Sequence, residues 1–400
     1  MIKVAVLGYG NIGSGVVQVL MKNKETIAKK AGDEIVPACV LDLRDFPGDV
    51  MEDKVVKDIN LITQNPEISI VVETMGGTKP AYAFVKACLE AGKHVATSNK
   101  ELVAAHGPEL LEIAKAHHVS FLFEASVGGG IPIIRPLVSS ITSDAVTEIT
   151  GILNGTTNYM LTKMSEDGLD YDAVLEDAQE RGYAERNPAA DVEGHDARRK
   201  IAILSSLAFG KYVDYEDVYT EGITKITSAD FAYAKVLGSR IKLFGTSKKK
   251  EDRSISAMVC PVMITNEHPL FAVNDVMNAI LVRGESMGDL MFYAGAGKLP
   301  TASAVVADVV NAARNPKITE IAPYEPGKMT VSDHLKSTHS YFVRVKGSDA
   351  NAVAESFKAK QIVDAGIADE FGLITAEWAE NEFDALCENY PVVSVIRLAK

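Results

Sequence analysis

A lysine and several acids gather in the stretch GYAERNPAADVEGHDARRK, which ends at Lys200. Asp196 and Lys200 stand four residues apart, so on a helix they share a face and can form an ion pair. An ammonium group among apolar neighbours needs such a partner, and its pKa responds to its surroundings. Many pairs of this kind are only structural. Here the nearby carboxylates of Glu185 and Asp191 indicate a pocket for a polar substrate that carries an amino group.

A buried helix is expected to hold the lysine. After Asp196 the run ARRKIAILSSLAFG repeats apolar residues at helical spacing and stops at Gly210, a residue type that often ends helices. Upstream, the polar run NGTTN holds Gly155 and Thr156, and its hydroxyl and amide groups are candidates to contact the substrate. An ordinary turn explains this run equally well.

A second chemical signal lies at the N-terminus. The strand-like run IKVAVL leads into GYGNIG, beginning at Gly8, and then into a helical run, which is the order of a dinucleotide-binding turn. Gly8 permits the tight turn, Gly10 lets the backbone approach a pyrophosphate, and Gly13 permits close packing of the helix. The helix start, at Asn11 and Ile12, offers N–H groups to the phosphates. The alternative is a tight turn that binds no nucleotide.

The next strand-like run, IVPACVLDL, ends near Asp42. An acid at this place can accept hydrogen bonds from both ribose hydroxyls of NAD, whereas Arg44 can instead meet the 2′-phosphate of NADP. The separation of Gly13 and Asp42 is longer than the usual ~20 residues. The choice between NAD and NADP therefore stays open.

Strand-like and helical runs alternate as far as VSFLFEA, with one helix expected over 109–117. This alternation predicts right-handed crossovers onto a parallel, doubly wound sheet. Met75 and Gly76, and likewise Ser98 and Lys100, then follow strands at their carboxyl ends, where such a sheet binds ligands. These four residues are further candidates to bind the cofactor.

Composition excludes several classes of partner. The 400 residues carry a formal net charge of -13, with 47% hydrophobic and 24% charged residues, which suits two or three globular domains that bind small solutes. An acidic chain is a poor partner for nucleic acid or an anionic membrane. The four cysteines show no paired spacing, and no apolar run approaches 18 residues, so we expect a cytoplasmic protein that spans no membrane.

The pattern changes after Glu124, where EASVGGGIPIIRPL bends tightly. We expect a nucleotide domain over 1–132, to which a helix over 301–320 returns, and a second domain over 133–300. The tail, 335–400, predicts a βαββαβ order, which is ferredoxin-like. Its expected elements are strand 340–346, helix 350–357, strands 361–368 and 371–379, helix 380–388 and strand 391–398.

Six segments, in this order and spacing, closely resemble the homoserine dehydrogenase family over residues 1 to about 325. They are the glycine turn at Gly8–Gly15, Ser98-Asn99-Lys100, EASVGGGIPII, GILNGTTNYML, the stretch ending at Lys200, and GAGKLPTASAVVADV. The tail resembles an ACT regulatory domain. The resemblance implies an α/β fold with a Rossmann-type doubly wound parallel sheet, an inserted α+β catalytic and dimerisation domain, and a small ligand-sensing tail, in a homodimer or homotetramer.

The resemblance also implies a reaction, the NAD(P)-dependent interconversion of L-homoserine and L-aspartate 4-semialdehyde on the route to threonine, methionine and isoleucine. Reducing the aldehyde builds charge on its oxygen, so a cation with a transferable proton lowers the barrier. By resemblance Lys200 is the proton donor and Lys100 its partner at the carbonyl and nicotinamide. Glu185 receives the substrate amino group, while Asp191 and Asp196 orient the substrate and the lysine.

A monovalent cation such as Na⁺ is implied at Glu124, Val127, Gly129 and Ile131, although a glycine-rich turn without an ion is the alternative. The pair Asp42 and Arg44 departs from the more basic strand end of NADP-preferring members. The tail lacks the Pro-Gly turn of ligand-binding ACT domains. Binding of an amino-acid effector by the tail therefore competes with a structural or dimerising role.

Two other functions are compatible with parts of the sequence. Another aspartate-pathway reductase, such as aspartate-semialdehyde dehydrogenase, needs a nucleophilic cysteine in a polar turn, but Cys88 lies in a helical run and Cys260 in an apolar one. A non-catalytic regulator that responds to nucleotides and amino acids is the second alternative. Binding alone would not require two lysines and clustered acids.

Overall fold

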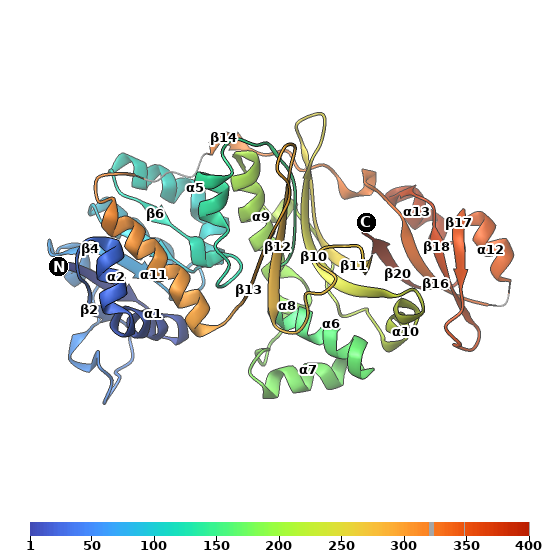
Figure 1. Ribbon diagram of the computed structural model, residues 1–400, viewed down its shortest axis with the longest axis horizontal. Helices are drawn as coiled ribbons and strands as arrows, with labels where there is room; N and C mark the ends of the chain where they lie inside the picture. The colour runs from blue at the N-terminus through green and yellow to red at the C-terminus, as the bar shows by residue number, and fades with distance from the viewer. Residues whose placement is uncertain (320–323, 348, 400) are drawn as a thin grey trace. The chain divides into compact units, whose positions relative to one another are not determined.

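The computed structural model describes residues 1–319, 324–347 and 349–399 (Figure 1). Contacts divide the chain into two compact units. Unit 1 comprises Met1–Ser143, Ile203–Tyr215 and Ala294–Lys328, and unit 2 comprises Asp144–Ala202, Glu216–Tyr293 and Met329–Lys400. Helix α9 (His195–Phe209) begins in unit 2 and ends in unit 1. The expected domains, 1–132 with 301–320, 133–300 and 335–400, stay predictions, and residues 320, 348 and 400 lie outside the described residues.

Unit 1 is built on a parallel sheet with the strand order β3-β2-β1-β4-β5-β6. The strands are β1 (Ile2–Leu7), β2 (Ile35–Leu41), β3 (Val55–Val56), β4 (Ile68–Glu73), β5 (His94–Thr97) and β6 (Phe121–Leu122). The direction of the order reverses between β1 and β4, which is where such sheets bind dinucleotides. The predicted doubly wound parallel sheet is confirmed.

Helices flank this sheet because each buries an apolar stripe. They are α1 (Asn11–Lys22), α2 (Lys24–Ala31), α3 (Asn60–Thr63), α4 (Ala81–Glu90), α5 (Lys100–Ala116) and α11 (Lys298–Arg314), and a short pair, β8 (Lys211–Tyr212) with β14 (Glu325–Lys328), adds to the unit. Helix α11 packs closely on α1, since a Cβ at Gly15 would lie 3.1 Å from Ala302. Among the described residues every helix is too short or too polar to cross a membrane.

Helix α5 is longer than the sequence predicts. The expected helix over 109–117 is wrong at its start, because α5 begins at Lys100 and contains Pro108. A proline lacks the N–H that would bond the carbonyl four residues earlier. In this helix the Tyr212 hydroxyl donates to that carbonyl, on Ala104, at 3.0 Å. The helix therefore continues through the proline, and Lys100 stands in its first turn.

Unit 2 contains a mixed sheet with the order β13-β12-β7-β10-β11-β20-β16-β18-β17. The strands of the inserted part are β7 (Val146–Ile152), β10 (Ser239–Lys249), β11 (Ile255–Thr265), β12 (Met277–Gly284) and β13 (Gly288–Gly295), with β9 (Tyr219–Thr220) beside β11. Helices α6 (Gly155–Asp167), α7 (Tyr171–Glu180), α8 (Ala189–Val192), α10 (Ser228–Val236) and the start of α9 complete it.

The tail follows the predicted βαββαβ order. It comprises β16 (Tyr341–Lys346), α12 (Ala350–Ser356), β17 (Ala359–Val363), β18 (Glu370–Thr375), α13 (Glu380–Cys387) and β20 (Val392–Leu398). The strand expected over 371–379 is broken after Thr375, and β19 (Trp378–Ala379) pairs instead with β15 (Thr338–His339). Whether this unit is an ACT domain stays a proposal.

Backbone pairing and buried charge connect the tail to the inserted sheet. Strand β20 runs parallel to β11, with Val262 opposite Arg397. The Arg397 guanidinium donates to Glu380 of α13 and, at 2.8 Å, to Glu221 of the inserted part. Arg344 of β16 likewise lies 3.0 Å from Asp230. Buried charges remain stable only when paired, so these ion pairs bind the tail to the rest of unit 2.

Lys242 of β10 is buried, and its ammonium group donates to neutral oxygens. Its Nζ donates to the Val273 carbonyl at 2.6 Å and to the side-chain oxygens of Asn158 and Asn274 at 3.0 and 3.1 Å. Burial lowers the pKa of Lys242 to about 7, because the interior disfavours the charged form. Folding above that pH therefore requires a proton to be released.

This predicts that the protein becomes more stable as the pH rises from 7 toward 10. The unfolded chain holds a proton on residue 242 that the folded chain has lost, so the free energy of unfolding should rise by up to about 1.4 kcal/mol per pH unit. Chemical denaturation at several pH values measures this slope. Lys242→Met should remove it, whereas the exposed Lys235→Met should not. An equal slope in wild type and Lys242→Met would contradict the prediction.

Candidate active site

The glycine turn between β1 and α1 is shaped by two close approaches. Gly8 has φ +86°, and a Cβ there would lie 2.8 Å from the Met75 side chain. A Cβ at Gly13 would lie only 2.0 Å from the Gly8 carbonyl oxygen. Nothing lies within 4 Å of the Cβ position at Gly10. The protein itself therefore requires Gly8 and Gly13, while Gly10 leaves open space beside the turn.

Helix α1 begins at this turn without a side-chain cap. Gly10 occupies the N-cap position and has no side chain, so no cap hydrogen bond forms, and the helix starts at Asn11 and Ile12. The first N–H groups of a helix have no partner within it and attract anions. Together with the open space at Gly10, this arrangement can hold the pyrophosphate of a dinucleotide.

Asp42 and Arg44, at the end of β2, contact each other. Asp42 accepts a hydrogen bond from the Tyr9 backbone N–H at 2.8 Å, and Arg44 donates to both carboxylate oxygens, from Nε at 3.0 Å and Nη2 at 2.9 Å. The Arg44 hydrogen bonds hold the pKa of Asp42 well below its usual range. Both candidates for the ribose side are thus in one place, and the Arg44 side chain is 62% exposed.

A buried acid that sequence reasoning missed organises the sheet rim. Glu73, the last residue of β4, is fully buried and accepts hydrogen bonds from the Met75 backbone N–H at 2.7 Å and the Thr97 hydroxyl at 2.5 Å. Burial raises the pKa of Glu73. Its signal in the sequence is an acid that ends the apolar run ISIVV. Glu73 joins the Met75-Gly76 and Ser98–Lys100 segments into one rim.

Asn99 completes this rim. Its Oδ1 caps α5 by accepting from the Leu102 N–H at 3.0 Å, and its Nδ2 donates to the Gly77 carbonyl at 2.6 Å. The Ser98 N–H donates to the Glu73 backbone carbonyl at 3.3 Å. Lys100 is the first residue of α5. The structure therefore brings Met75, Gly76, Ser98 and Lys100 together, as the positions of their strand ends predicted.

The carboxylate of Glu124 is engaged in hydrogen bonds with the backbone. Glu124 accepts from three successive backbone N–H groups, of Ile133 and Ile134 at 2.7 Å and of Arg135 at 2.9 Å. Those bonds leave the backbone carbonyls of the turn, including those of Val127, Gly129 and Ile131, as the more suitable oxygens for an ion. In the described residues no group of three His, Cys, Asp or Glu side chains could hold a metal ion.

The predicted ion pair is present in unit 2. Lys200 Nζ lies 2.6 Å from Asp196 Oδ2 and donates to the Leu153 carbonyl at 2.7 Å. The Lys200 side chain is 14% exposed and that of Asp196 only 3%. Helix α9 places the two residues one turn apart on the same face. The pair is therefore largely shielded from water, which strengthens it.

Other predicted substrate residues lie on the elements around this pair. Asp191, in α8, accepts from Asn154 Nδ2 at 2.7 Å, and the same amide donates to Asp196 at 2.8 Å. Thr156 donates to the Tyr183 carbonyl at 2.6 Å, which ties α6 to the loop that carries the exposed Glu185. A hydroxyl engaged in this way fixes the loop before it contacts any ligand.

Two residues of the NGTTN run have packing roles. A Cβ at Gly155 would lie 2.8 Å from the Val276 carbonyl oxygen, so this position is glycine because the backbones approach closely. Asn158 is buried and donates to the carbonyls of Val273, Asp275 and Met277. The run is therefore more than a turn. It starts helix α6, and Asn158 anchors that helix beside β12.

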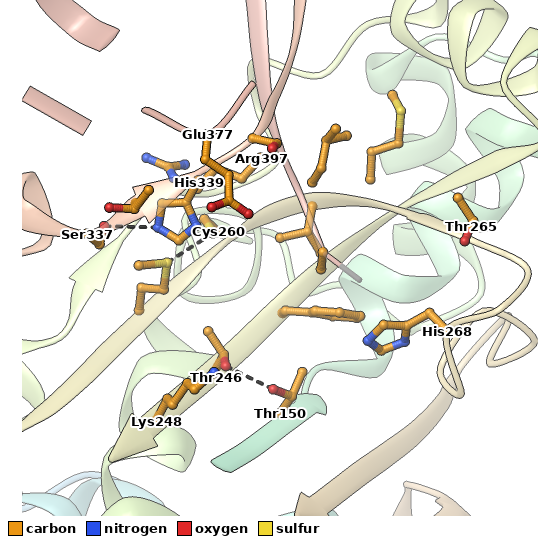
Figure 2. Close-up of a pocket in the computed structure, with 18 of the residues that line it drawn as sticks. Thr150, Thr246, Lys248, Cys260, Thr265, His268, Ser337, His339, Glu377 and Arg397 are labelled. Carbon is orange, nitrogen blue, oxygen red and sulfur yellow. Dashed lines mark hydrogen bonds between the residues drawn. The ribbon is translucent and has the colours of Figure 1, made fainter. Parts of the chain in front are cut away.

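Unit 2 also has a separate hollow of about 1030 Å³, shown in Figure 2. Strands β7, β10 and β11 and the tail line it, and none of the predicted site residues is among its lining residues. Within it the Thr150 and Thr246 hydroxyls lie 2.8 Å apart, and His339 bonds Ser337 at 2.9 Å (Figure 2). This hollow is therefore distinct from the cluster around Lys200.

Comparison with known proteins is consistent across methods. Residues 132–310 match the family described as homoserine dehydrogenase, and residues 8–124 match its NAD binding domain. The chain is 41% identical over 390 residues to homoserine dehydrogenase of Mycobacterium tuberculosis, covering 92% of this chain and 88% of that one. A solved homoserine dehydrogenase from Thiobacillus denitrificans aligns with a TM-score of 0.92 at 33% identity, covering 100% and 98%.

A hyperthermophilic archaeal homoserine dehydrogenase in complex with NADPH aligns with a TM-score of 0.66 at 24% identity, over 78% of this chain and 97% of that one. At this identity the likeness is one of fold alone.

Substitutions at Gly10 and at Gly13 should affect different properties, cofactor binding in the first case and stability in the second. Gly10→Ala should leave the melting temperature nearly unchanged, because its Cβ meets open space, but should weaken dinucleotide binding by tenfold or more, since the methyl group occupies room for phosphate, roughly 1.4 kcal/mol or more. Gly13→Ala should instead destabilise the fold. Thermal unfolding and cofactor titration separate the two effects. Unchanged cofactor affinity in Gly10→Ala would contradict the assigned role of Gly10.

Proposed function

The chain belongs to the homoserine dehydrogenase family, and from this premise we propose how its own residues perform the reaction. It is an NAD(P)-dependent oxidoreductase that interconverts L-homoserine and L-aspartate 4-semialdehyde. The single observation that supports the proposed mechanism best is the shielded pair of Lys200 and Asp196, with the Leu153 carbonyl as a second acceptor. The bound nicotinamide cofactor supplies or accepts the hydride.

Lys200 is the proposed proton donor to the substrate oxygen during aldehyde reduction. Asp196 stabilises the ammonium form, and the Leu153 carbonyl restricts its direction, so the proton is held in one place before substrate arrives. In the reverse direction the neutral amine receives the proton from the alcohol. A positive group near the oxygen also offsets the charge that develops there.

Three further roles are proposed on the same basis. Lys100, in the first turn of α5, assists at the carbonyl and the nicotinamide. Glu185, exposed on the loop before α8, pairs with the substrate ammonium group, and Asp191 orients the substrate from α8. Thr156 holds the Glu185 loop through the Tyr183 carbonyl, and Gly155 permits the close approach of the backbones. The substrate is thus recognised by its charged amino-acid end.

Cofactor binding uses the residues of the rim and the turn. Gly8, Gly10, Asn11, Ile12 and Gly13 form the proposed phosphate site. Met75, Gly76, Ser98 and Lys100 face the nicotinamide side, and the pair Asp42 and Arg44 meets the adenosine ribose. The open cradle at Gly10 and the uncapped start of α1 support this assignment.

A monovalent cation is proposed at the backbone carbonyls of Glu124, Val127, Gly129 and Ile131. The Glu124 carboxylate would act indirectly, since it fixes the turn through three backbone N–H groups. Hard cations such as Na⁺ prefer oxygen ligands, and carbonyl oxygens suffice for a single charge. The ion would then set the conformation of the turn.

Several broader expectations also remain proposals. We propose that the enzyme serves threonine, methionine and isoleucine synthesis in the cytoplasm as a homodimer or homotetramer. The hollow of Figure 2 is the proposed place for an amino-acid effector of the tail. Its lining includes three lysines for a carboxylate, Lys248, Lys336 and Lys360, and Glu377 for an ammonium group. A structural role of the tail is the competing proposal.

The assigned proton donor predicts a specific kinetic defect. Lys200→Ala should lower kcat by at least about 100-fold, roughly 2.7 kcal/mol of transition-state stabilisation, and leave cofactor affinity intact. Steady-state oxidation of homoserine with NAD and with NADP, followed by nicotinamide absorbance, measures it. The control is Lys163→Ala, which removes a partly exposed pair with Asp167 at the same four-residue spacing and should change little.

Two outcomes of that assay would oppose the proposal. Near-normal kcat in Lys200→Ala would remove this lysine from the mechanism. Absence of turnover by the wild-type protein with either cofactor would favour the non-catalytic regulator.

Arg44 predicts the direction of a change in cofactor preference. Arg44→Ala should raise KM for NADP relative to KM for NAD by about tenfold or more, because the 2′-phosphate loses a charge-assisted hydrogen bond while the Asp42 carboxylate becomes available to ribose hydroxyls. Asp42→Ala should shift the ratio the other way. An unchanged ratio in both variants would place the adenosine ribose elsewhere.

A further inference from the structure

Asn154 lies at the junction of β7 and α6, and the two ends of its side chain have different partners. The residue is 7% exposed. Its Oδ1 accepts from the Thr157 N–H at 2.9 Å and so caps α6. Its Nδ2 donates to Asp191 at 2.7 Å and to Asp196 at 2.8 Å. An amide group carries two hydrogens, and these two carboxylates account for both.

The arrangement joins carboxylates from two different helices. Asp191 comes from α8 and Asp196 from α9, and both accept from the same amide. Two carboxylates that share one donor group are close enough to repel each other unless that donor lies between them. The Asp196 oxygen that Asn154 binds, Oδ2, is the oxygen that also lies 2.6 Å from Lys200 Nζ. A displacement of the amide would therefore move the acceptor that orients the lysine.

The same junction binds the lysine through its backbone. Leu153, the preceding residue, offers its carbonyl to Lys200 Nζ at 2.7 Å. Gly155, the following residue, approaches the Val276 carbonyl so closely that a Cβ would lie 2.8 Å from it, which fixes the junction beside β12. Leu153 thus binds the Lys200 ammonium group directly and Asn154 binds it through Asp196, while Gly155 fixes the position of both.

We propose that Asn154 is a positioning residue for the dehydrogenase reaction. Its amide holds Asp191 and Asp196 together, so that the direction of the Lys200 proton and the place of the substrate are set by one side chain. The inference rests on the proposed roles of Lys200 and Asp191. It adds that neither acid is correctly placed without the bridging donor.

The chemistry explains why this position is asparagine. Aspartate would cap α6 equally well, but it cannot donate when ionised and would add a third carboxylate. Serine also caps a helix, but its hydroxyl has a single hydrogen on a shorter side chain. Asparagine combines a capping acceptor with two donors that point the other way.

Two substitutions separate the cap from the bridge. Asn154→Asp and Asn154→Ser both keep a capping acceptor, so both variants should retain helix α6, and kcat is compared per folded molecule. Both should lower kcat by about 100-fold, since each loses hydrogen bonds to charged groups, while the dissociation constant for the cofactor is retained. The structural control is Asn158→Ser, four residues along α6, which should lower the melting temperature but keep kcat per folded molecule.

Asn154→Asp supplies a readout that a purely structural role would not move. The charged groups that bond residue 154 or its partners are Asp191 on α8 and Asp196 and Lys200 on α9, and Glu193 and His195 lie between the two aspartates in the chain. Among three carboxylates one retains a proton to higher pH, and a protonated Asp at 154 can donate to one neighbour. Its kcat relative to wild type should therefore recover as the pH falls, whereas Asn154→Ser should show no recovery.

The outcomes distinguish this inference from the proposed function. If Lys200→Ala loses turnover while both Asn154 variants keep kcat within about threefold of wild type, the positioning role is wrong and the proton donor stands. A fall in kcat that only parallels loss of folded protein, with no recovery of Asn154→Asp at low pH, also overturns it. Loss of kcat per folded molecule at normal cofactor affinity, with recovery of Asn154→Asp at low pH, supports it.

Discussion

The structure of unit 2 depends on keeping one ammonium group charged where little water reaches it. Lys200 is 14% exposed and its partner Asp196 is 3% exposed, so an unpaired charge there would be costly. The surrounding elements supply the groups that stabilise this charge. Helix α9 carries the pair, the β7–α6 junction supplies a carbonyl and an amide, and α8 adds a second carboxylate.

In unit 1, the groups available to bind an anion at the glycine turn are backbone N–H groups rather than cationic side chains. Gly8 and Gly13 have no room for a Cβ, and α1 begins with uncapped N–H groups because its N-cap residue, Gly10, has no side chain. Behind it the buried Glu73 and Asn99 join two strand ends into one rim. Because a nicotinamide cofactor itself supplies or accepts the hydride, unit 1 needs only to bind and orient it.

Local patterns were predictable from the sequence, and long-range partners were not. The glycine turn, the helix after Asp196 and the βαββαβ tail each follow from spacing within a short window, as do Asp196 and Lys200. The helix expected over 109–117 began too late, because Pro108 inside the actual helix is compensated by Tyr212, far along the chain. Glu73 was missed for the same reason, and the polar run at Asn154 was noticed without its contacts to Asp191 and Asp196, which only the fold brings near.

The parallel pairing of β20 with β11 has a consequence for any shortened form of this chain. Without the tail, the outer edge of β11 near Val262 and Met263 would lose its neighbouring strand, and Glu221 and Asp230 would lose their arginines. A bare strand edge can pair with other chains, and the buried Asp230 would be left without its partner, which is costly. The tail, whatever else it binds, therefore covers an edge of the mixed sheet that would otherwise be open to other chains.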